Sequence, residues 1–154
     1  MSIERSWRAI AAAIPSTRPP ASEDDVVRVE DVIGAELPDD VRRSLLLHDG
    51  VPEEDMFDAL GDGNAEDVYE AIMGCDAIIR DWRRWRELRD CGDVDDGMWA
   101  PSMVPLADGG EGNSIAVDVG TGELLYLDPE VGHEPARWRT WGDYLAAVAR
   151  VVGR

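Results

Sequence analysis

The chain has 154 residues, with 33 acidic and 15 basic side chains, and its formal net charge is −18. A charge of this size and sign argues against nucleic acids and anionic membrane surfaces as partners, because phosphate groups would be repelled. The length suits one domain with a hydrophobic core, and no apolar run is long enough to span a bilayer.

The first expected element is an amphipathic helix over residues 3–14, with Trp7, Ile10 and Ile14 on one face. This stretch lacks the continuous apolar core and cleavage site of a signal peptide, so we predict a cytoplasmic protein. Pro15 is expected to end this helix, and residues 16–21, which contain two more prolines, are expected to form a linker. The prediction is one domain over residues 1–154, divided into an N-terminal helix with its linker (1–21) and a core (22–154).

Two further helices are expected in the N-terminal half. Ser22 followed by Asp25 is typical of a capping box, and the helix it begins ends at Gly34. Pro38 suits the first turn of the next helix. Residues 51–65 are rich in acids and glycines and are expected to form a loop, and residues 68–73 are ambiguous between helix and strand.

A longer helix is expected over residues 77–89, with Asp76 as its cap and with Ile78, Trp82 and Trp85 on one face. Its arginines, together with the two indoles, raise the alternative of stacking on nucleic acid. The net charge favours buried indoles instead.

An antiparallel sheet is expected to follow. Prolines keep residues 99–106 extended, and Gly109, Gly110 and Gly112 allow positive φ. Runs over 115–119 and 123–127 flank a glycine turn and predict a hairpin. Residues 129–134 are expected to form a loop and residues 136–139 another strand. A last helix begins at Thr140. Helices, then hairpins, then a closing helix indicate an α+β fold with an antiparallel sheet.

No residue pattern indicates catalysis, a cofactor or a metal. Cys75 and Cys91 lie at opposite ends of the expected helix, about 20 Å apart, too far for a disulfide or a shared zinc. Neither His48 nor His133 belongs to a nucleophile motif. Carboxylate pairs such as Asp95 and Asp96 occur at short spacing, as chance predicts in a chain so rich in acids.

Acidic residues are concentrated in one part of the chain. Residues 92–135 contain ten acids and no arginine, whereas the segments on either side are rich in arginine. A surface of one sign can steer a basic protein partner toward itself, although acidic residues also keep proteins soluble.

Several short motifs resemble the SUKH superfamily. They are Ile33-Gly34-x-x-Leu37-Pro38, His48-Asp49-Gly50, Trp99-x-Pro101, Pro105-Leu106-Ala107, Gly112-Asn113, and Asp118 before a glycine turn. The resemblance covers roughly residues 26–152 and excludes residues 51–73. The superfamily includes bacterial immunity proteins and fungal cell-wall assembly regulators.

The resemblance implies a fold in which helices pack around an antiparallel sheet. It also implies a non-catalytic protein that binds and blocks a toxin, and the acidic segment suggests that this toxin is basic, for example a nuclease. The alternative is a regulatory scaffold. The candidate partner-binding residues are Asp93, Asp95, Asp96, Asp108, Glu111 and Asp128. The family-motif residues, structural or binding, are Trp99, Pro101, Gly112, Asn113 and Asp118. For Asp118, the structural interpretation is a carboxylate that accepts N–H bonds from the adjacent turn. For Trp99, it is a core anchor.

Overall fold

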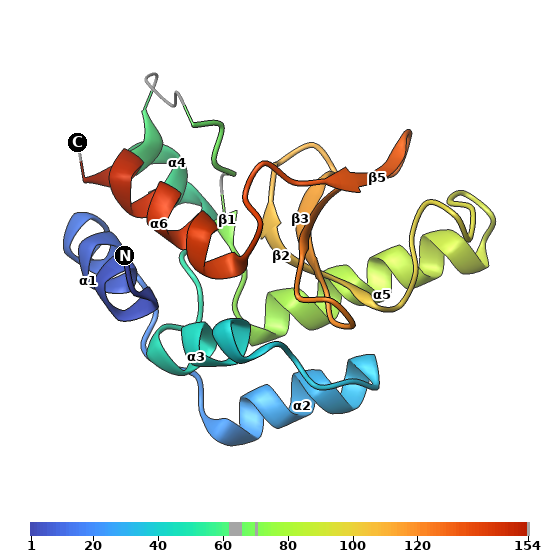
Figure 1. Ribbon diagram of the computed structural model, residues 1–154, viewed down its shortest axis with the longest axis horizontal. Coiled ribbons are helices and arrows are strands. Elements are labelled where there is room, and N and C mark those ends of the chain that lie inside the picture. The colour runs from blue at the N-terminus through green and yellow to red at the C-terminus, as the bar shows by residue number, and fades with distance from the viewer. Residues whose placement is uncertain (62–65, 70, 154) are drawn as a thin grey trace.

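The computed structural model describes residues 1–61, 66–69 and 71–153. Within these ranges the chain forms six α-helices and one five-stranded antiparallel sheet (Figure 1). The helices are α1 (Ile3–Ala13), α2 (Glu23–Ile33), α3 (Asp39–Leu47), α4 (Glu53–Leu60), α5 (Cys75–Asp90) and α6 (Trp141–Val152). The strands, which lie in chain order across the sheet, are β1 (Ala71–Ile72), β2 (Met103–Asp108), β3 (Ser114–Asp118), β4 (Leu124–Asp128) and β5 (Gly132–Pro135). The predicted α+β fold with an antiparallel sheet is confirmed.

The helix starts follow local side-chain chemistry. Ser22 Oγ accepts from the Asp25 N–H at 3.0 Å, and an Asp25 carboxylate oxygen accepts from the Ser22 N–H at 3.3 Å, which completes the predicted capping box. Thr140 caps α6 in the same way through the Asp143 N–H at 3.2 Å. The start of α5 differs from the prediction, because its N-cap is Gly74 and Asp76 lies in the first turn.

Helix α4 lies in the stretch expected to be a loop. Its first turn carries three acids, which favour a helix N-terminus electrostatically. Met56 and Leu60, four residues apart, are both buried and fix the helix to the core. The acids that suggested a loop are therefore the first-turn residues of a short helix. Residues 62–65 of that predicted loop lie outside the described residues.

The fifth strand also differs from the prediction. It covers Gly132–Pro135, inside the expected loop, and residues 136–139 form no strand. The register pairs Leu127 with His133 and Leu125 with Pro135. Three of its four residues are exposed, so this edge strand has no hydrophobic pattern that could have predicted it. Its last residue is a proline, which is tolerated in a strand at the edge of a sheet.

The predicted hairpin is confirmed as β3 and β4, with Val117 opposite Leu124 and Ser114 opposite Leu127. The sheet is covered on both faces at β3, where Ile115, Ala116 and Val117 are all fully buried. In β2, the register of pairing with β3 shifts between Pro105 and Ala107. Pro105 has no backbone N–H to donate to the neighbouring strand, which favours an irregularity at this point.

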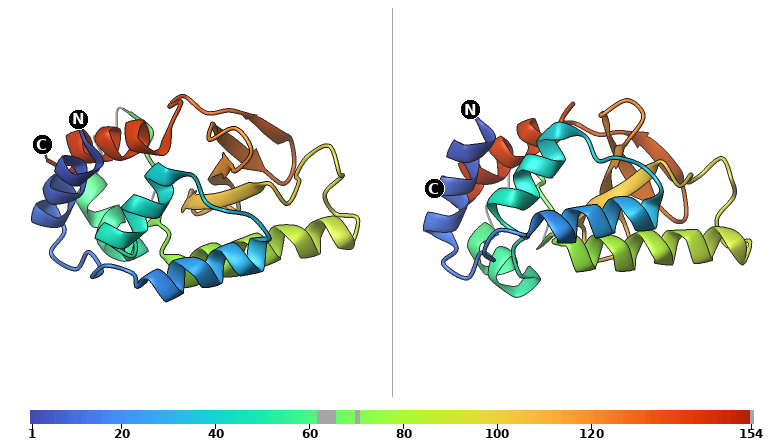
Figure 2. Two further views of the ribbon diagram at one scale, coloured as in Figure 1. Left: turned by 60° about the horizontal axis from the view of Figure 1, so that its bottom comes forward. Right: turned by 90° about the horizontal axis from the view of Figure 1, so that it is seen from below.

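The helices form two groups around the sheet. Helix α5 runs along the sheet and packs on β2, and α2 packs against α5 (Figure 2). Helices α1, α3 and α6 pack together beside the sheet. At their centre, Ser44 of α3 is buried, and its Oγ accepts indole N–H bonds from Trp7 of α1 at 2.9 Å and Trp141 of α6 at 3.0 Å. One hydroxyl thus joins three helices.

Candidate functional site

Trp99 lies in the loop between α5 and β2, and its side chain is fully buried. Its ring packs between the α5 indoles of Trp82 and Trp85, with ring centroids 6.0 and 6.5 Å away. Its Nε1 donates to the Met103 carbonyl oxygen at 3.0 Å. The role of Trp99 as a core anchor is confirmed. Because Trp82 and Trp85 are buried as well, stacking of these indoles on nucleic acid is excluded.

Two further motif residues hold loops in place through their carbonyl groups. The Pro101 carbonyl accepts from Trp82 Nε1 at 3.0 Å, and the Gly112 carbonyl accepts from Arg84 at 3.2 Å. Asn113 Oδ1 is buried, without a hydrogen-bond partner among the described residues. The sequence indicated that Gly109, Gly110 and Gly112 allow positive φ, and of these three Gly110 and Gly112 have it. At Gly109, a Cβ would lie 2.4 Å from Asn113 Oδ1, so close approach is what requires glycine there.

The last residue of each of the three central strands is an aspartate with the same role. Oδ1 of Asp108, Asp118 and Asp128 accepts the N–H two residues further on, in each case at 2.8 Å. These are turn-forming hydrogen bonds. The structural interpretation of Asp118 is confirmed, and Asp108 and Asp128, which were predicted to bind a partner, form the same turn hydrogen bond. Asp118 lies at the opposite end of the sheet from the other two.

Three acidic turns meet at the end of the sheet that carries Asp108 and Asp128. A Cβ on Gly112, in the β2–β3 turn, would lie 4.0 Å from the Pro129 ring in the β4–β5 turn. On its other side, a Cβ on Gly132 would lie 3.6 Å from Met98, in the loop after α5. We call the acids of these turns the acidic edge, and its members are Asp93, Asp95, Asp96, Asp108, Glu111, Asp128 and Glu130.

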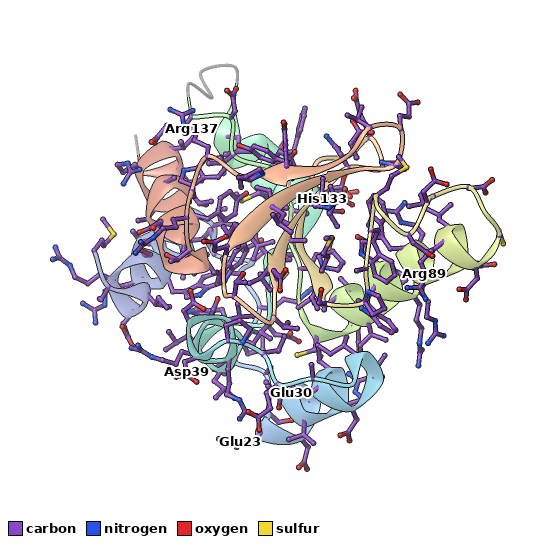
Figure 3. All side chains as sticks on the ribbon, turned by 45° about the vertical axis from the view of Figure 1, so that its right-hand side comes forward. Glu23, Glu30, Asp39, Arg89, His133 and Arg137 are labelled. Carbon is purple, nitrogen blue, oxygen red and sulfur yellow. The ribbon has the colours of Figure 1, made fainter. Side chains whose placement is uncertain are left out.

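The acidic edge is almost uncompensated. Among the described residues, its single ion-pair contact joins Asp96 to Arg89 at 3.9 Å, and the Asp96 side chain is 96% exposed. Such a contact contributes little. Some acids of α1 and α2 differ, because Glu4 pairs with Arg43 and Glu30 with Arg42. Figure 3 shows Glu23, Glu30 and Asp39 on α2 and α3, well away from His133 of β5.

The His48-Asp49-Gly50 motif also has a structural role. Asp49 Oδ1 accepts the Cys75 N–H at 2.7 Å and so satisfies a backbone donor in the first turn of α5 from a distant loop. Gly50 has φ +84°, and a Cβ there would lie 2.6 Å from the backbone of Gly74. His48 is the C-cap of α3, and its Nδ1 lies 2.7 Å from the Arg18 carbonyl oxygen.

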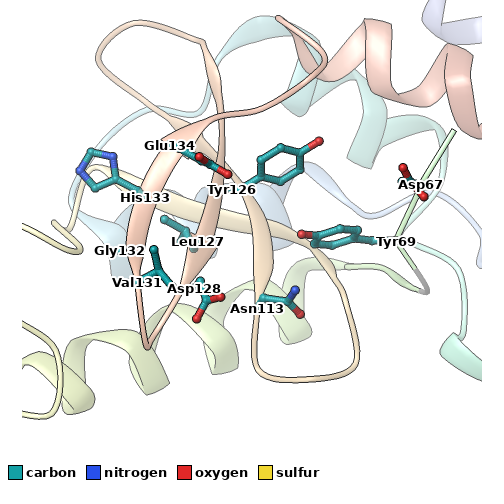
Figure 4. A pocket seen from close by; sticks show the side chains of 10 residues that line it. All are labelled: Asp67, Tyr69, Asn113, Tyr126, Leu127, Asp128, Val131, Gly132, His133 and Glu134. Atoms are coloured by element: carbon teal, nitrogen blue, oxygen red, sulfur yellow. The ribbon is translucent and has the colours of Figure 1, made fainter.

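Sequence reasoning missed a pocket beside the acidic edge. It has a volume of about 410 Å³, and Tyr69 and Tyr126 line it, with the three carboxylates of Asp67, Asp128 and Glu134 (Figure 4). No residue spacing predicts this pocket, because Asp67 and Tyr69 precede β1, whereas the other lining residues named here lie on β4 and β5, at the other side of the sheet. Tyr126 and Asp128 are two residues apart on one strand and so share a face, and this was the one sequence signal for the pocket.

The described residues bring together no group of side chains that could hold a metal ion. No three His, Cys, Asp or Glu side chains within residues 1–61, 66–69 and 71–153 are grouped closely enough to hold a metal ion. Cys75 and Cys91 stand at the two ends of α5, as predicted, and both are free thiols. Burial, with a further contribution from Asp49, raises the pKa of the Cys75 thiol to about 12.

A labelling experiment tests this description of the thiols. The thiolate is the reactive species, so the protonated, buried Cys75 should resist alkylation at neutral pH while the exposed Cys91 reacts. We expect one iodoacetamide adduct per native chain and two per unfolded chain, counted by mass spectrometry. The variant Cys91→Ser should take up none when native. Two adducts on the native chain would show that Cys75 is accessible.

These features define an acidic α+β protein in which the motif residues support the fold and the unpaired charge lies on exposed turns. The chain belongs to the SMI1/KNR4 family (SUKH-1), whose model matches residues 20–147. The predicted resemblance is confirmed, and α1 precedes the matched region. The family consists generally of non-catalytic immunity and regulatory proteins, and its members bind protein partners.

A comparison with curated proteins gives no match. Of the helices formed by the described residues, none combines the length and apolar character needed to cross a membrane.

Proposed function

We propose that this protein is a cytoplasmic immunity protein that binds a basic toxin, such as a nuclease, and occludes it without chemistry. The acidic edge is the proposed contact surface. The observation that carries the proposal is that the edge gathers carboxylates from three turns and leaves nearly all of them without an arginine partner in the described structure.

The unpaired charge supports this proposal more than it supports a general role in solubility. Elsewhere on the molecule, acids are paired in part with arginines, as Glu4 and Glu30 are. An edge of one sign raises the rate of encounter with a partner of opposite sign. Close charge pairs across an interface have measured couplings of about 1.5–7 kcal/mol, so carboxylates of the edge can contribute affinity as well as rate.

An apolar group accompanies the charge. Val131, in the β4–β5 turn at the middle of the edge, is 81% exposed. Interfaces combine a desolvated apolar contact with a polar rim. In the proposed complex, Val131 is buried against the toxin and the carboxylates around it pair with Arg and Lys side chains.

Co-expression tests this function. The probe is any toxin-like C-terminal domain that is found on a secreted protein encoded by a neighbouring gene. The wild-type chain should restore growth of cells that produce this domain. The edge variant carries Asp95→Lys, Asp96→Lys and Glu111→Lys. Because these side chains are exposed in turns, it should fold but lose protection.

A matched control separates position from net charge. The control variant carries Glu23→Lys, Asp31→Lys and Glu36→Lys, all exposed and without an ion pair among the described residues. Both variants reverse three charges, and thermal unfolding verifies that both fold. The control should still protect. Protection by the edge variant would refute the contact surface, and a wild-type chain that protects against no such domain would favour a regulatory scaffold.

A further inference from the structure

The pocket between Tyr69 and the β4–β5 hairpin has the composition of a cation site. Its volume of about 410 Å³ falls within the usual range of ligand sites. Asp67, Asp128 and Glu134 line it, and no arginine is among its lining residues in the described part of the chain. Val131 stands at its margin, exposed to solvent.

The strand register brings the charged and aromatic groups to one face. Tyr126 and Asp128 are two residues apart on β4 and therefore share a face. Glu134 of β5 is the direct cross-strand partner of Tyr126 and lies on that same face. Figure 4 shows the Glu134 carboxylate beside Tyr126, and the His133 ring pointing away from both tyrosines.

The two tyrosines form a fixed aromatic wall. Their rings stack with centroids 6.1 Å apart and an interplanar angle of 27°. The Tyr69 N–H donates to Tyr144 Oη at 2.9 Å, and the Tyr126 ring packs edge-on against Trp138. Tyr144 and Trp138 are buried, so the wall rests on the core. Such a wall binds cations through the faces of its rings.

The electrostatic potential at this wall is negative. Burial, followed by the nearby Tyr126, Asp128 and Glu134, raises the pKa of Tyr69 to about 12. The hydroxyl therefore stays protonated and neutral near neutral pH. The nearby arginine, Arg137, is turned away, because its guanidinium donates to the Glu66 carbonyl at 3.3 Å and lies over the Trp138 ring.

We propose that this pocket binds the guanidinium group of an arginine side chain, stacked on the tyrosine wall and paired with the carboxylates of Asp67, Asp128 and Glu134. A guanidinium is favoured over an ammonium because it is planar, stacks on aromatic rings and pairs with two carboxylates at once. The assignment of that arginine to the toxin rests on the proposed function. The affinity of the pocket for a guanidinium does not.

The test uses N-acetylarginine methylamide as probe and the ring-proton NMR signals of Tyr69 and Tyr126 as readout. The signals are assigned with single Tyr→Phe variants. We expect saturable shifts of both rings. The citrulline analogue has the same shape without the charge, and it should bind at least about fivefold more weakly.

An isosteric variant tests the carboxylates without altering the shape of the pocket. Asp67→Asn, Asp128→Asn and Glu134→Gln remove three charges. An asparagine at position 67 can keep the observed φ of +54°, and an asparagine at position 128 can keep the turn hydrogen bond. The matched control, Glu23→Gln, Asp31→Asn and Glu36→Gln, removes three charges far from the pocket. The pocket variant should bind the arginine probe at least about fivefold more weakly, and the control should bind it as the wild type does.

The outcomes of the test are distinct. Absence of saturable shifts, or equal binding of the citrulline probe, overturns the cation site. A third probe, N-acetyllysine methylamide, carries an ammonium in place of the guanidinium, and its binding with equal affinity overturns the preference for guanidinium. Equal weakening in the pocket variant and the control assigns the effect to net charge and also overturns the site. If the probe binds as expected but co-expression gives no protection, the proposed function fails and the guanidinium site stands.

Discussion

Replacing Trp99 by alanine should lower the free energy of unfolding by about 3–5 kcal/mol, the usual loss for a large buried aromatic side chain. Trp99 is fully buried, and it packs against Trp82 and Trp85 of α5. The substitution leaves a cavity between the helix and the loop that leads into β2, and removes the indole N–H donor to Met103. Urea unfolding, followed by circular dichroism, measures the change.

The control for this substitution is Phe57→Ala, which truncates an aromatic side chain of α4 that is 60% exposed. Its cost should stay within about 0.5 kcal/mol. If Trp99→Ala unfolds at the same urea concentration as the wild type, Trp99 is not the anchor between α5 and the sheet. Its position in the family motif would then require a binding role.

The second large effect is expected for Ser44→Ala. The substitution leaves the indole N–H groups of Trp7 and Trp141 buried without their acceptor. An unsatisfied buried donor costs about 1–3 kcal/mol, so we expect a total loss of about 2–4 kcal/mol. Thermal and urea unfolding both measure it.

Ser6→Ala is the matched control. Ser6 of α1 is also a fully buried serine, but its Oγ has no hydrogen-bond partner in the part of the chain that the structure describes. Removing this hydroxyl should leave the stability unchanged or raise it by up to about 1 kcal/mol, because alanine is also the better helix former. Equal effects of the two substitutions would show that the hydroxyl of Ser44 does not join the three helices.

The elements with strong local signals could be predicted from the sequence. The capping box at Ser22 and Asp25, the hairpin of β3 and β4, and the buried face of α5 each follow from spacing within one segment. The family motifs added the order of these elements. The core position of Trp99 followed from its place before two prolines and a sheet.

The elements with weak local signals could not be predicted. Strand β5 is polar and exposed, so its pairing with β4 alone defines it. Helix α4 depends on two buried residues among many acids.

The candidate site shows the same limit. The acidic residues and their segregation were visible in the sequence, but the convergence of three turns depends on tertiary contacts such as Gly132 with Met98. The turn-forming bonds of Asp108 and Asp128 were missed, although aspartates recur at ten-residue intervals in this segment. The tyrosine pocket joins Tyr69 to Tyr126, which are far apart in sequence, and only the fold brings them together.

The association rate of the chain with its purified toxin domain, measured by stopped flow over about 0.01–0.5 M salt, tests the role of the acidic edge most directly. The wild-type rate should fall steeply as salt rises. At low salt, the edge variant should associate at least about tenfold more slowly, with little salt dependence, because electrostatic steering raises association rates by about 10- to 1,000-fold. The control variant should stay close to the wild type. Equal slowing in both variants, or no slowing in either, would contradict the proposal that the acidic edge receives a basic partner.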